Sequence, residues 1–367
     1  MAPGFTLVGV WTREHSTADL ADPSVNFFVD TKTNGDFGET AIYFSRTQFN
    51  VVAGGGYLSS SRTDRYSYFF GAFALDSDTT HKNAWVYATV NPTDNLHVTL
   101  GASYDSFRSN NISAAVLDRD QFNPKIGLIW EIAPGSVLRA AYFEGLKRTV
   151  VGGQTIEPTQ IAGFNQLFDD VNSTKTKRWG AGFDQKFGEQ LFAGIEWSQR
   201  QLEVPGFDAT VFPPVITDQD WGETLARSYI DWVITDRFST NFGLQWERFV
   251  RDPTGSTIGY FANMDILRVP LEFRYFDPSG LLAFLRTSYV HQRGRFLQSS
   301  PQVLYSGQSS FAVVDAGVGW RFPGRAIIGT LQVKNLLNSG FKFQDSDAAN
   351  PAFIPRRFLL GRITFSF

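Results

Sequence analysis

The sequence predicts an all-β fold, a membrane-spanning antiparallel up-and-down β-barrel of about 16 strands. Strand-like segments of about ten to thirteen residues alternate apolar and polar side chains along the chain. The connections between them are short and turn-like or long and polar, in alternation. A tilted strand needs ~9–11 residues to cross a bilayer, whereas strands of soluble sheets average ~5–6. We therefore expect a single transmembrane β-barrel domain over residues 1–367.

The alternation is clearest in the segment 125–132. Its even-numbered residues, from Ile126 to Ile132, are all apolar, whereas Lys125, Gly127 and Glu131 lie on the other face. The same pattern recurs in residues 191–200, 238–247, 267–275 and 314–322. A soluble β-sandwich alternates equally well. Strand length, the alternating connections and the terminal Phe367 favour the barrel instead.

The segments form consecutive hairpins. The expected strand pairs are 4–13 with 36–46, 49–59 with 83–92, 95–108 with 121–133, 136–148 with 175–187, 190–203 with 222–235, 238–250 with 262–276, 280–293 with 310–322, and 325–336 with 357–367. Short turns would face the periplasm and long loops the outside. Residues 66–75 are strand-like inside an expected loop, so either a strand extends above the membrane there or the strand count is locally wrong.

Composition narrows the function classes. The absence of cysteine removes disulfides, thiolate metal sites and cysteine nucleophiles. Aromatic residues make up 15% of the chain, which is normal for a barrel with aromatic rims. Charged residues at 19%, and no run of the ~18–20 apolar residues that a spanning helix needs, exclude a helical membrane bundle. The net charge of −3 and the lack of a basic block give no reason to expect a nucleic-acid partner.

Two stretches carry a family resemblance. The C-terminal VKNLLN followed by a polar loop and PRRFLLGRITFSF, and the internal FNPKIGLIWEIAPGSVLRAAYFEGLKR with QTIEPTQ, resemble the C-terminal barrel of TonB-dependent receptors. The resemblance covers about residues 121–170 and 330–367. It implies a location in the bacterial cell outer membrane, with outer-membrane lipid around the barrel.

The sequence departs from that family in two respects. It shows no N-terminal plug and no TonB box, and it has room for about 16 strands where outer-membrane transporters have 22. Sixteen strands are closer to porins and to the barrel of tetratricopeptide-repeat-linked exporters of exopolysaccharide. The N-terminus does not resemble a signal peptide, so we expect either a removed leader or the C-terminal part of a longer protein.

If the apolar face meets lipid, the polar face lines the lumen. The pore-lining candidates are Lys125, Arg139, Arg178, Lys186, Arg200, Arg227, Arg268, Arg274, Arg286, Arg321, Glu196, Glu247, Glu272 and Asp315. Most such charges simply pair and solvate. The alternative is that the basic excess sets a preference for anionic solutes.

The loop Lys147–Asp170 is too long for a simple turn. Its functional interpretation is a constriction folded into the pore, with Glu157, Asp169 and Asp170 facing basic wall residues. The alternative is an external loop packed on its neighbours. Within it, Gly152–Gly153 allow a sharp bend, and residues 159–169 are compatible with a short helix.

The function that we expect is an outer-membrane pore for solutes or an exported polymer. The alternatives are a plugged structural barrel that anchors a periplasmic or surface protein partner, or the barrel part of a TonB-dependent uptake receptor. We do not expect an enzyme, a metal or a cofactor. The four histidines, His15, His81, His97 and His291, are far apart in sequence and match no metal-binding motif.

Overall fold

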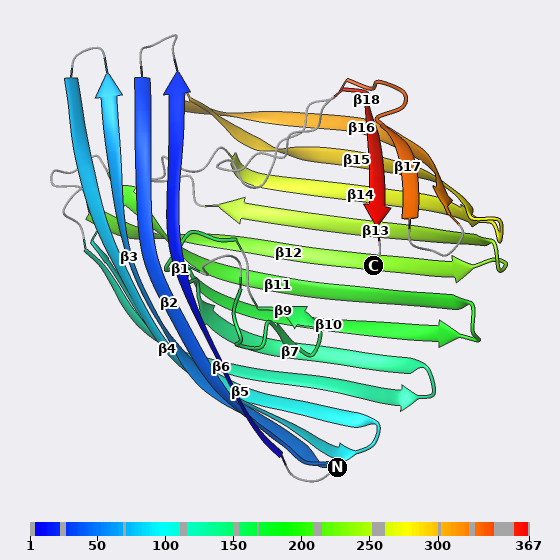
Figure 1. The fold of residues 1–367 in the computed structure, drawn as a ribbon, viewed down its shortest axis with the longest axis horizontal. Helices are drawn as coiled ribbons and strands as arrows, with labels where there is room; N and C mark the ends of the chain where they lie inside the picture. Colours follow the sequence, from blue (N-terminus) through cyan, green and yellow to red (C-terminus); the bar gives the residue numbers. More distant parts are fainter. Residues whose placement is uncertain are drawn as a thin grey trace.

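A computed structural model describes residues 4–22, 27–68, 71–110, 116–149, 154–166, 169–208, 215–251, 261–299, 302–322, 327–340 and 356–365. One antiparallel sheet of 16 strands follows the chain order (Figure 1). Its strands are β1 (Gly4–Asp22), β2 (Phe27–Ser45), β3 (Phe49–Tyr68), β4 (Gly71–Thr93), β5 (Leu96–Asn110), β6 (Val116–Ala133), β7 (Ser136–Leu146), β10 (Lys175–Phe187), β11 (Leu191–Asp208), β12 (Val215–Val233), β13 (Phe238–Arg251), β14 (Phe261–Phe276), β15 (Leu281–Ser299), β16 (Gln302–Arg321), β17 (Ile327–Lys334) and β18 (Phe358–Phe365).

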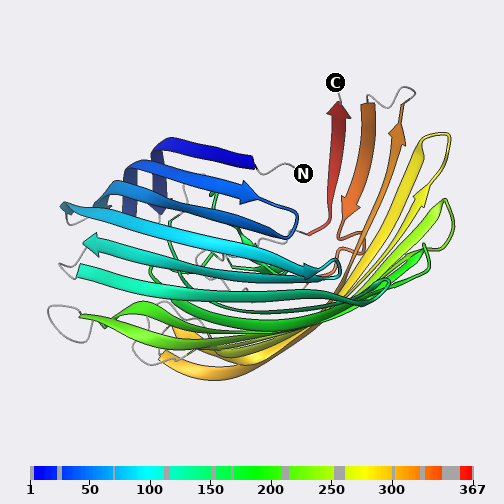
Figure 2. The same ribbon diagram turned by 90° about the horizontal axis from the view of Figure 1, so that it is seen from below.

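The sheet curls into a deep trough with one concave and one convex face (Figure 2). Every strand is bonded to its neighbours in sequence order, which is the up-and-down topology of a barrel. Within the described residues β1 and β18 are not paired with each other, so the sheet is open along this seam. Backbone groups left unpaired in a bilayer are costly, so both edges need partners in the membrane.

The predicted strand count and hairpins are confirmed, but several strands are longer than expected. β1 and β2 each run for 19 residues and are paired over their whole length, from Gly4 with Ser45 to Asp22 with Phe27. The ladder continues beyond a membrane-spanning length because each added pair satisfies further backbone groups. The described part of residues 66–75 falls on β3 and β4, whose ladder continues to Tyr68 and Gly71. They therefore extend a hairpin and do not disturb the strand count. Phe367 lies outside the described residues.

Burial on the two faces is the reverse of that in a soluble sheet. Large apolar side chains are exposed on the convex face, including Trp11, Phe122 (63% exposed) and Ile195 (62%). Polar and charged side chains such as Glu39 and Asn123 are buried on the concave face. This distribution fits a barrel surrounded by lipid with a polar interior. Among the described residues, no helix is long and apolar enough to span a bilayer.

Candidate pore and its inner loop

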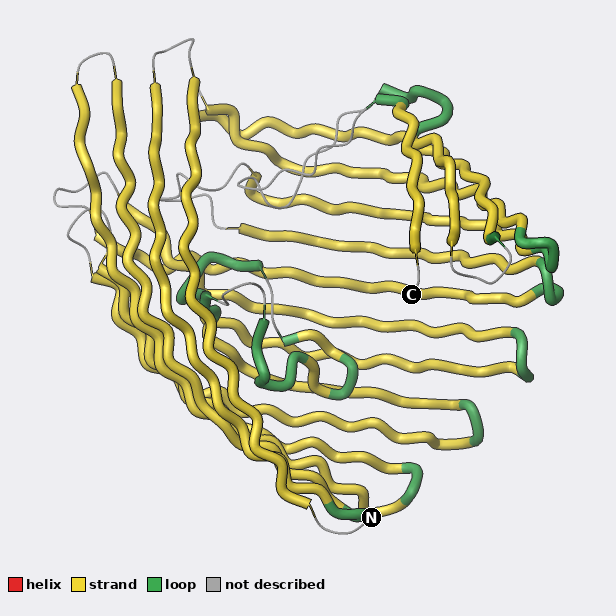
Figure 3. The backbone as a smooth tube through the Cα atoms, in the orientation of Figure 1, coloured by secondary structure: helices red, strands yellow, loops and turns green. Residues whose placement is uncertain are grey.

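The described residues between 147 and 174, which we call the inner loop, fold back into the concavity of the sheet (Figure 3). The loop contains a small hairpin of β8 (Gln160–Ile161) and β9 (Phe164–Asn165). The predicted short helix over residues 159–169 is therefore wrong. Ala162 (φ 47°) and Gly163 (φ 83°) both have positive φ, as a tight hairpin turn requires and a right-handed helix forbids. Gly152 and Gly153 lie outside the described residues.

Arg148 fastens the start of the inner loop. Its guanidinium lies 3.2 Å from a carboxylate oxygen of Glu39 on β2 and 2.8 Å from Glu157 within the loop. The arginine and Glu39 side chains are 4% and 0% exposed. Glu39 also accepts hydrogen bonds from the Thr155 hydroxyl (2.9 Å) and the Ile156 backbone N–H (2.8 Å). A buried carboxylate is stable here because each of these donors compensates for lost water.

Glu157 is held from a second side by β4. The Tyr87 hydroxyl donates to Glu157 Oε1 at 2.5 Å, and Tyr87 also accepts a bond from the side-chain amide of Gln166 at 3.1 Å. Lys125 on β6 donates from Nζ to Gln166 Oε1 at 2.9 Å. The loop thus bonds to three strands that are separated in the chain. Of the predicted constriction residues, Glu157 faces the wall, but its basic partner is the loop's own Arg148.

The apolar side chains of the hairpin pack against glycines of the sheet. A Cβ added at Gly127 on β6 would lie 2.7 Å from Ile161 Cγ2, and one added at Gly180 on β10 would lie 2.5 Å from a ring carbon of Phe164. Ile161 and Phe164 are both 1% exposed. Glycine at these wall positions lets the loop approach the sheet backbone directly.

The far end of the inner loop is fastened to β11. Asp170 forms an ion pair with Arg200, which also pairs with Glu223 of β12 at 2.6 Å. Burial raises the pKa of Asp170 above its ordinary value, and Arg200 acts against this effect. Asp169 is exposed and interacts electrostatically with Lys147. Of the three acidic residues predicted for the constriction, Asp170 therefore meets a wall cation, whereas Asp169 does not lie against the wall.

The strand register places all the pore-lining candidates on the concave face, the side that carries the inner loop. Cross-strand pairs link β11 to β16 on this face: Glu196 with Arg227, Gln245 with Arg268, Glu272 with Arg286, and Arg286 with Asp315. The register also places the remaining candidates on the concave face: Lys125, Arg139, Arg178, Lys186, Arg200, Arg274, Glu247 and Arg321. Whether these residues line a conducting path stays a prediction.

Most of the candidates meet in ion pairs. Glu196 pairs with Arg139 (3.4 Å) and Arg227 (2.9 Å), and Arg139 also pairs with Asp184 at 2.7 Å. Further along the sheet, the pairs are Arg268 with Glu247, Arg274 with Glu272, Arg286 with Glu272, and Lys334 with Asp315. Arg178 donates to the Asn165 carbonyl and to Ser198, so it also helps to hold the hairpin. Lys186 lies beside the short turn and near Glu189 (3.6 Å).

Glu39, Tyr87 and Arg148, which carry the loop contacts, were not among the residues predicted from the sequence. No spacing signal links residues that lie on different strands and meet only in the folded sheet.

A buried histidine–aspartate pair was not predicted either. His81 Nε2 lies 2.9 Å from Asp105 Oδ1, and both residues are buried. Nearby Ser103 is bonded to Asp105 and not to the histidine, so the arrangement is not that of an activated serine. The described residues contain no His, Cys, Asp and Glu group that would hold a metal ion.

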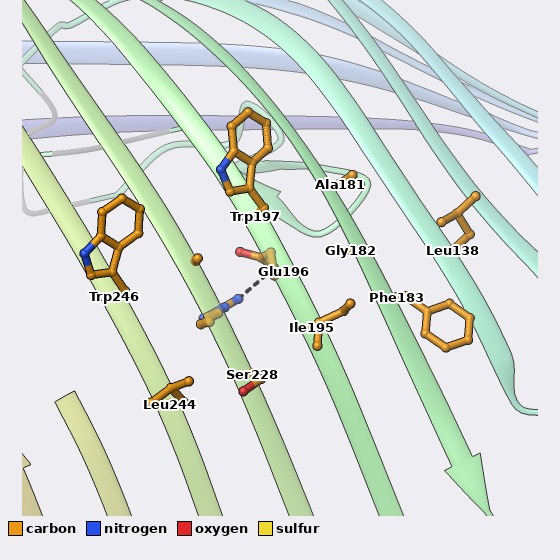
Figure 4. Close-up of a pocket in the computed structure, with 12 residues that line it drawn as sticks. Leu138, Ala181, Gly182, Phe183, Ile195, Glu196, Trp197, Ser228, Leu244 and Trp246 are labelled. Atoms are coloured by element: carbon orange, nitrogen blue, oxygen red, sulfur yellow. Dashed lines mark hydrogen bonds and ion pairs between the residues drawn. The ribbon is translucent and has the colours of Figure 1, made fainter. Parts of the chain in front are cut away.

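A shallow apolar groove of about 540 Å³ crosses the convex face from β7 to β13 (Figure 4). It is lined by small side chains such as Ala181, Ala226 and Ser228 and by larger ones such as Trp197 and Trp246. Glu196 and Arg227 belong to the same strands, but their side chains pair on the opposite, concave face. The groove shows how completely the two faces of one strand differ in polarity.

Comparison with known proteins agrees with this architecture. Residues 5–169 match the TonB dependent receptor-like, beta-barrel family. The TonB-receptor-like match therefore covers β1–β7 and most of the inner loop, and its C-terminal boundary falls close to Asp170. No curated protein matches the chain by sequence.

Solved structures show the same fold. A copper transporter, OprC, aligns with a TM-score of 0.70 at 13% identity over 99% of this chain and 62% of its own. The ferripyoverdine receptor of the Pseudomonas aeruginosa outer membrane aligns with a TM-score of 0.66 at 11% identity, over 100% of this chain and 54% of its own. The FrpB iron transporter from Neisseria meningitidis aligns with a TM-score of 0.66 at 13% identity, over 93% of this chain and 59% of its own. The chain thus spans a little over half the length of these proteins. It resembles the TonB-dependent receptor barrel and is a bacterial outer-membrane β-barrel.

Proposed function

We propose that the chain forms an outer-membrane passage for solutes or an exported polymer, narrowed by the inner loop. The observation that carries the proposal is the position of the loop, which is fastened inside the concavity at Arg148, at the Ile161–Phe164 hairpin and at Asp170. A loop on the outer surface would leave the concave face unobstructed. A loop inside it reduces the cross-section and sets which solutes pass.

The polar concave face supports the same proposal. Paired charges on this face keep their contact with water and with one another, which is the condition of a hydrated interior. The exposed apolar side chains on the convex face supply the lipid contact that such a passage needs.

The test is conductance of the folded protein in planar bilayers. The wild type should conduct, and replacing residues 155–166 with glycine and serine should raise the single-channel conductance severalfold. The double variant Gly127→Cys/Ile161→Cys is the matched control, because an oxidised disulfide would hold the hairpin on β6. It should conduct no better than the wild type until it is reduced. Bilayers that stay silent for all three folded proteins would contradict the pore.

A plugged, anchoring barrel is the second candidate, favoured by the burial of the Arg148–Glu39 contact. Silent bilayers together with co-purification of a stable periplasmic or surface partner would support it. The similarity to receptor barrels favours a third role, in TonB-dependent uptake. The mass of the native protein from membranes, compared with the full reading frame, tests that role by showing whether a plug belongs to the same chain.

A further inference from the structure

The inner loop covers only part of the concave face. The hydrogen bonds and ion pairs described above reach β2, β4, β6, β10 and β11. In Figures 1 and 3 the hairpin lies toward β7 and β10, away from the wall formed by β14–β17. A solute that passes the loop therefore travels along the other wall, β12–β18, which we call the far wall.

Basic side chains outnumber acidic ones on the concave face of the far wall. The basic residues are Arg227, Arg251, Arg268, Arg274, Arg286, Arg321, Lys334 and Arg362, and the acidic residues are Glu223, Asp231, Glu247, Glu272 and Asp315. Glu223 is already paired with Arg200 of β11, outside the far wall. The far wall therefore carries a net positive charge, although the whole chain is at −3.

Within the ion pairs of the far wall, each carboxylate is less exposed than its basic partner. The clearest case is Glu272, whose side chain is 11% exposed, whereas Arg274 and Arg286 are 52% and 42% exposed. Arg274 donates from Nε to Glu272 Oε1 at 2.6 Å. Arg286 donates from Nε and Nη2 to Oε2 at 2.8 and 2.6 Å.

One carboxylate thus pairs with two guanidiniums, so the cluster keeps a net positive charge. Each guanidinium has five N–H donors in a fixed planar fork, and the contacts with Glu272 engage only one or two of them. The half-exposed groups present the remaining donors to the concavity. Glu272 also holds both forks in place, which reduces the ordering cost of binding an anion.

We infer that the Arg274–Glu272–Arg286 cluster is an oxyanion-binding site, and that the passage selects solutes that carry carboxylate, phosphate or sulfate groups. This inference rests on the proposed pore and names its substrate class. Paired arginines match such groups because their forks donate two parallel hydrogen bonds to one oxyanion. The cluster lies close to the short turn after Phe276, at the end of the passage that faces the periplasm.

The first experiment measures the reversal potential in a tenfold KCl gradient. Arg274→Gln/Arg286→Gln should lower the chloride-to-potassium permeability ratio at least twofold, and Glu272→Gln should raise it. The control, Arg13→Gln/Arg108→Gln, removes two exposed and paired arginines from the convex face and should leave the ratio unchanged. Conducting channels with the same ratio in all variants would overturn the inference and leave the pore intact.

The second experiment does not need conductance. Isothermal titration of the folded protein in detergent with tripolyphosphate, and separately with an oligoglutamate, measures anion binding directly. Arg274→Gln/Arg286→Gln should weaken the binding of at least one probe about tenfold or more, and the two probes distinguish phosphate from carboxylate ligands. Binding of both probes that is as tight as that of the control variant would refute the site even if every bilayer were silent.

Discussion

The ring of Phe164 lies directly over the backbone of Gly180, so close that a Cβ at residue 180 would be 2.5 Å from the ring and 3.0 Å from Ser198 Cβ. Phe164 is also flanked by the guanidiniums of Arg139 and Arg178, at 5.5 and 5.8 Å from the ring centroid. The aromatic ring is thus held by the wall backbone and by two guanidiniums. The docked position of the inner loop depends on the absence of a side chain at residue 180.

Gly180→Ala should therefore loosen the inner loop. Overpacking a filled site costs about 1–3 kcal/mol, and moving the hairpin relieves it. Trypsin should then cleave faster after Lys147 or Arg148 in the folded protein. Gly145→Ala on β7 is the matched control. Gly145 lies on the same concave face as Gly180, and it has open space where its Cβ would be. Equal cleavage rates for the two variants would show that the ring does not hold the loop.

Arg148→Ala should release the start of the inner loop while the sheet stays folded. It leaves Glu39 and Glu157 buried without their shared cation, and breaking a buried pair in this way costs about 3–5 kcal/mol. We expect higher single-channel conductance and faster proteolysis of the loop. Arg108→Ala, at an exposed ion pair, should change neither. Arg148→Lys should recover only part of the effect, because a point charge cannot bridge two carboxylates as a planar fork does.

Lowering the pH should favour the docked loop. Burial raises the pKa of Asp170 above the value it would have in a released, hydrated loop. The docked state therefore binds the proton more readily than the released state. The free-energy preference for the docked loop grows as the pH falls through the pKa of Asp170 in the docked state, which lies above 3.8. Conductance should fall on acidification in this range. Asp170→Asn should lose this response. If the conductance of Asp170→Asn still falls on acidification, another group causes the pH response.

The turn after β14 should contribute acid-sensitive stability. Hydrogen bonds from the Ser279 hydroxyl, the Ser279 N–H (2.9 Å) and the Tyr275 hydroxyl (2.8 Å) hold the pKa of the Asp277 carboxyl at about 2. A depressed pKa gives stability that is present above the ordinary value of 3.8 and is lost as the pH falls toward 2. Asp277→Ala should lower the unfolding temperature in detergent at pH 7. The difference from the wild type should shrink below pH 4, and a difference independent of pH would exclude the carboxylate as its cause.

Much of the architecture could be read from the sequence because strand alternation is a local property. The even-numbered apolar residues from Ile126 to Ile132 predicted a two-faced strand, and β6 has the lipid-facing and concave faces that they require. The turn residues and strand lengths gave the strand count, since each hairpin is set within a few tens of residues. Strand ends were less predictable, because the ladder continues wherever the two chains stay in register, as β3 and β4 do to Tyr68 and Gly71.

The site depended on tertiary structure. The sequence marked the loop after Lys147 as unusual and placed Glu157 and Asp170 in it. It was also compatible with a short helix, where the structure has a hairpin whose turn residues Ala162 and Gly163 have positive φ. It gave no reason to join Arg148 to Glu39, which lies 109 positions earlier in the chain. Local pattern determined which face of each strand is polar. Only the curvature of the sheet decided which polar residues meet, because contacts across a barrel join positions with no fixed sequence separation.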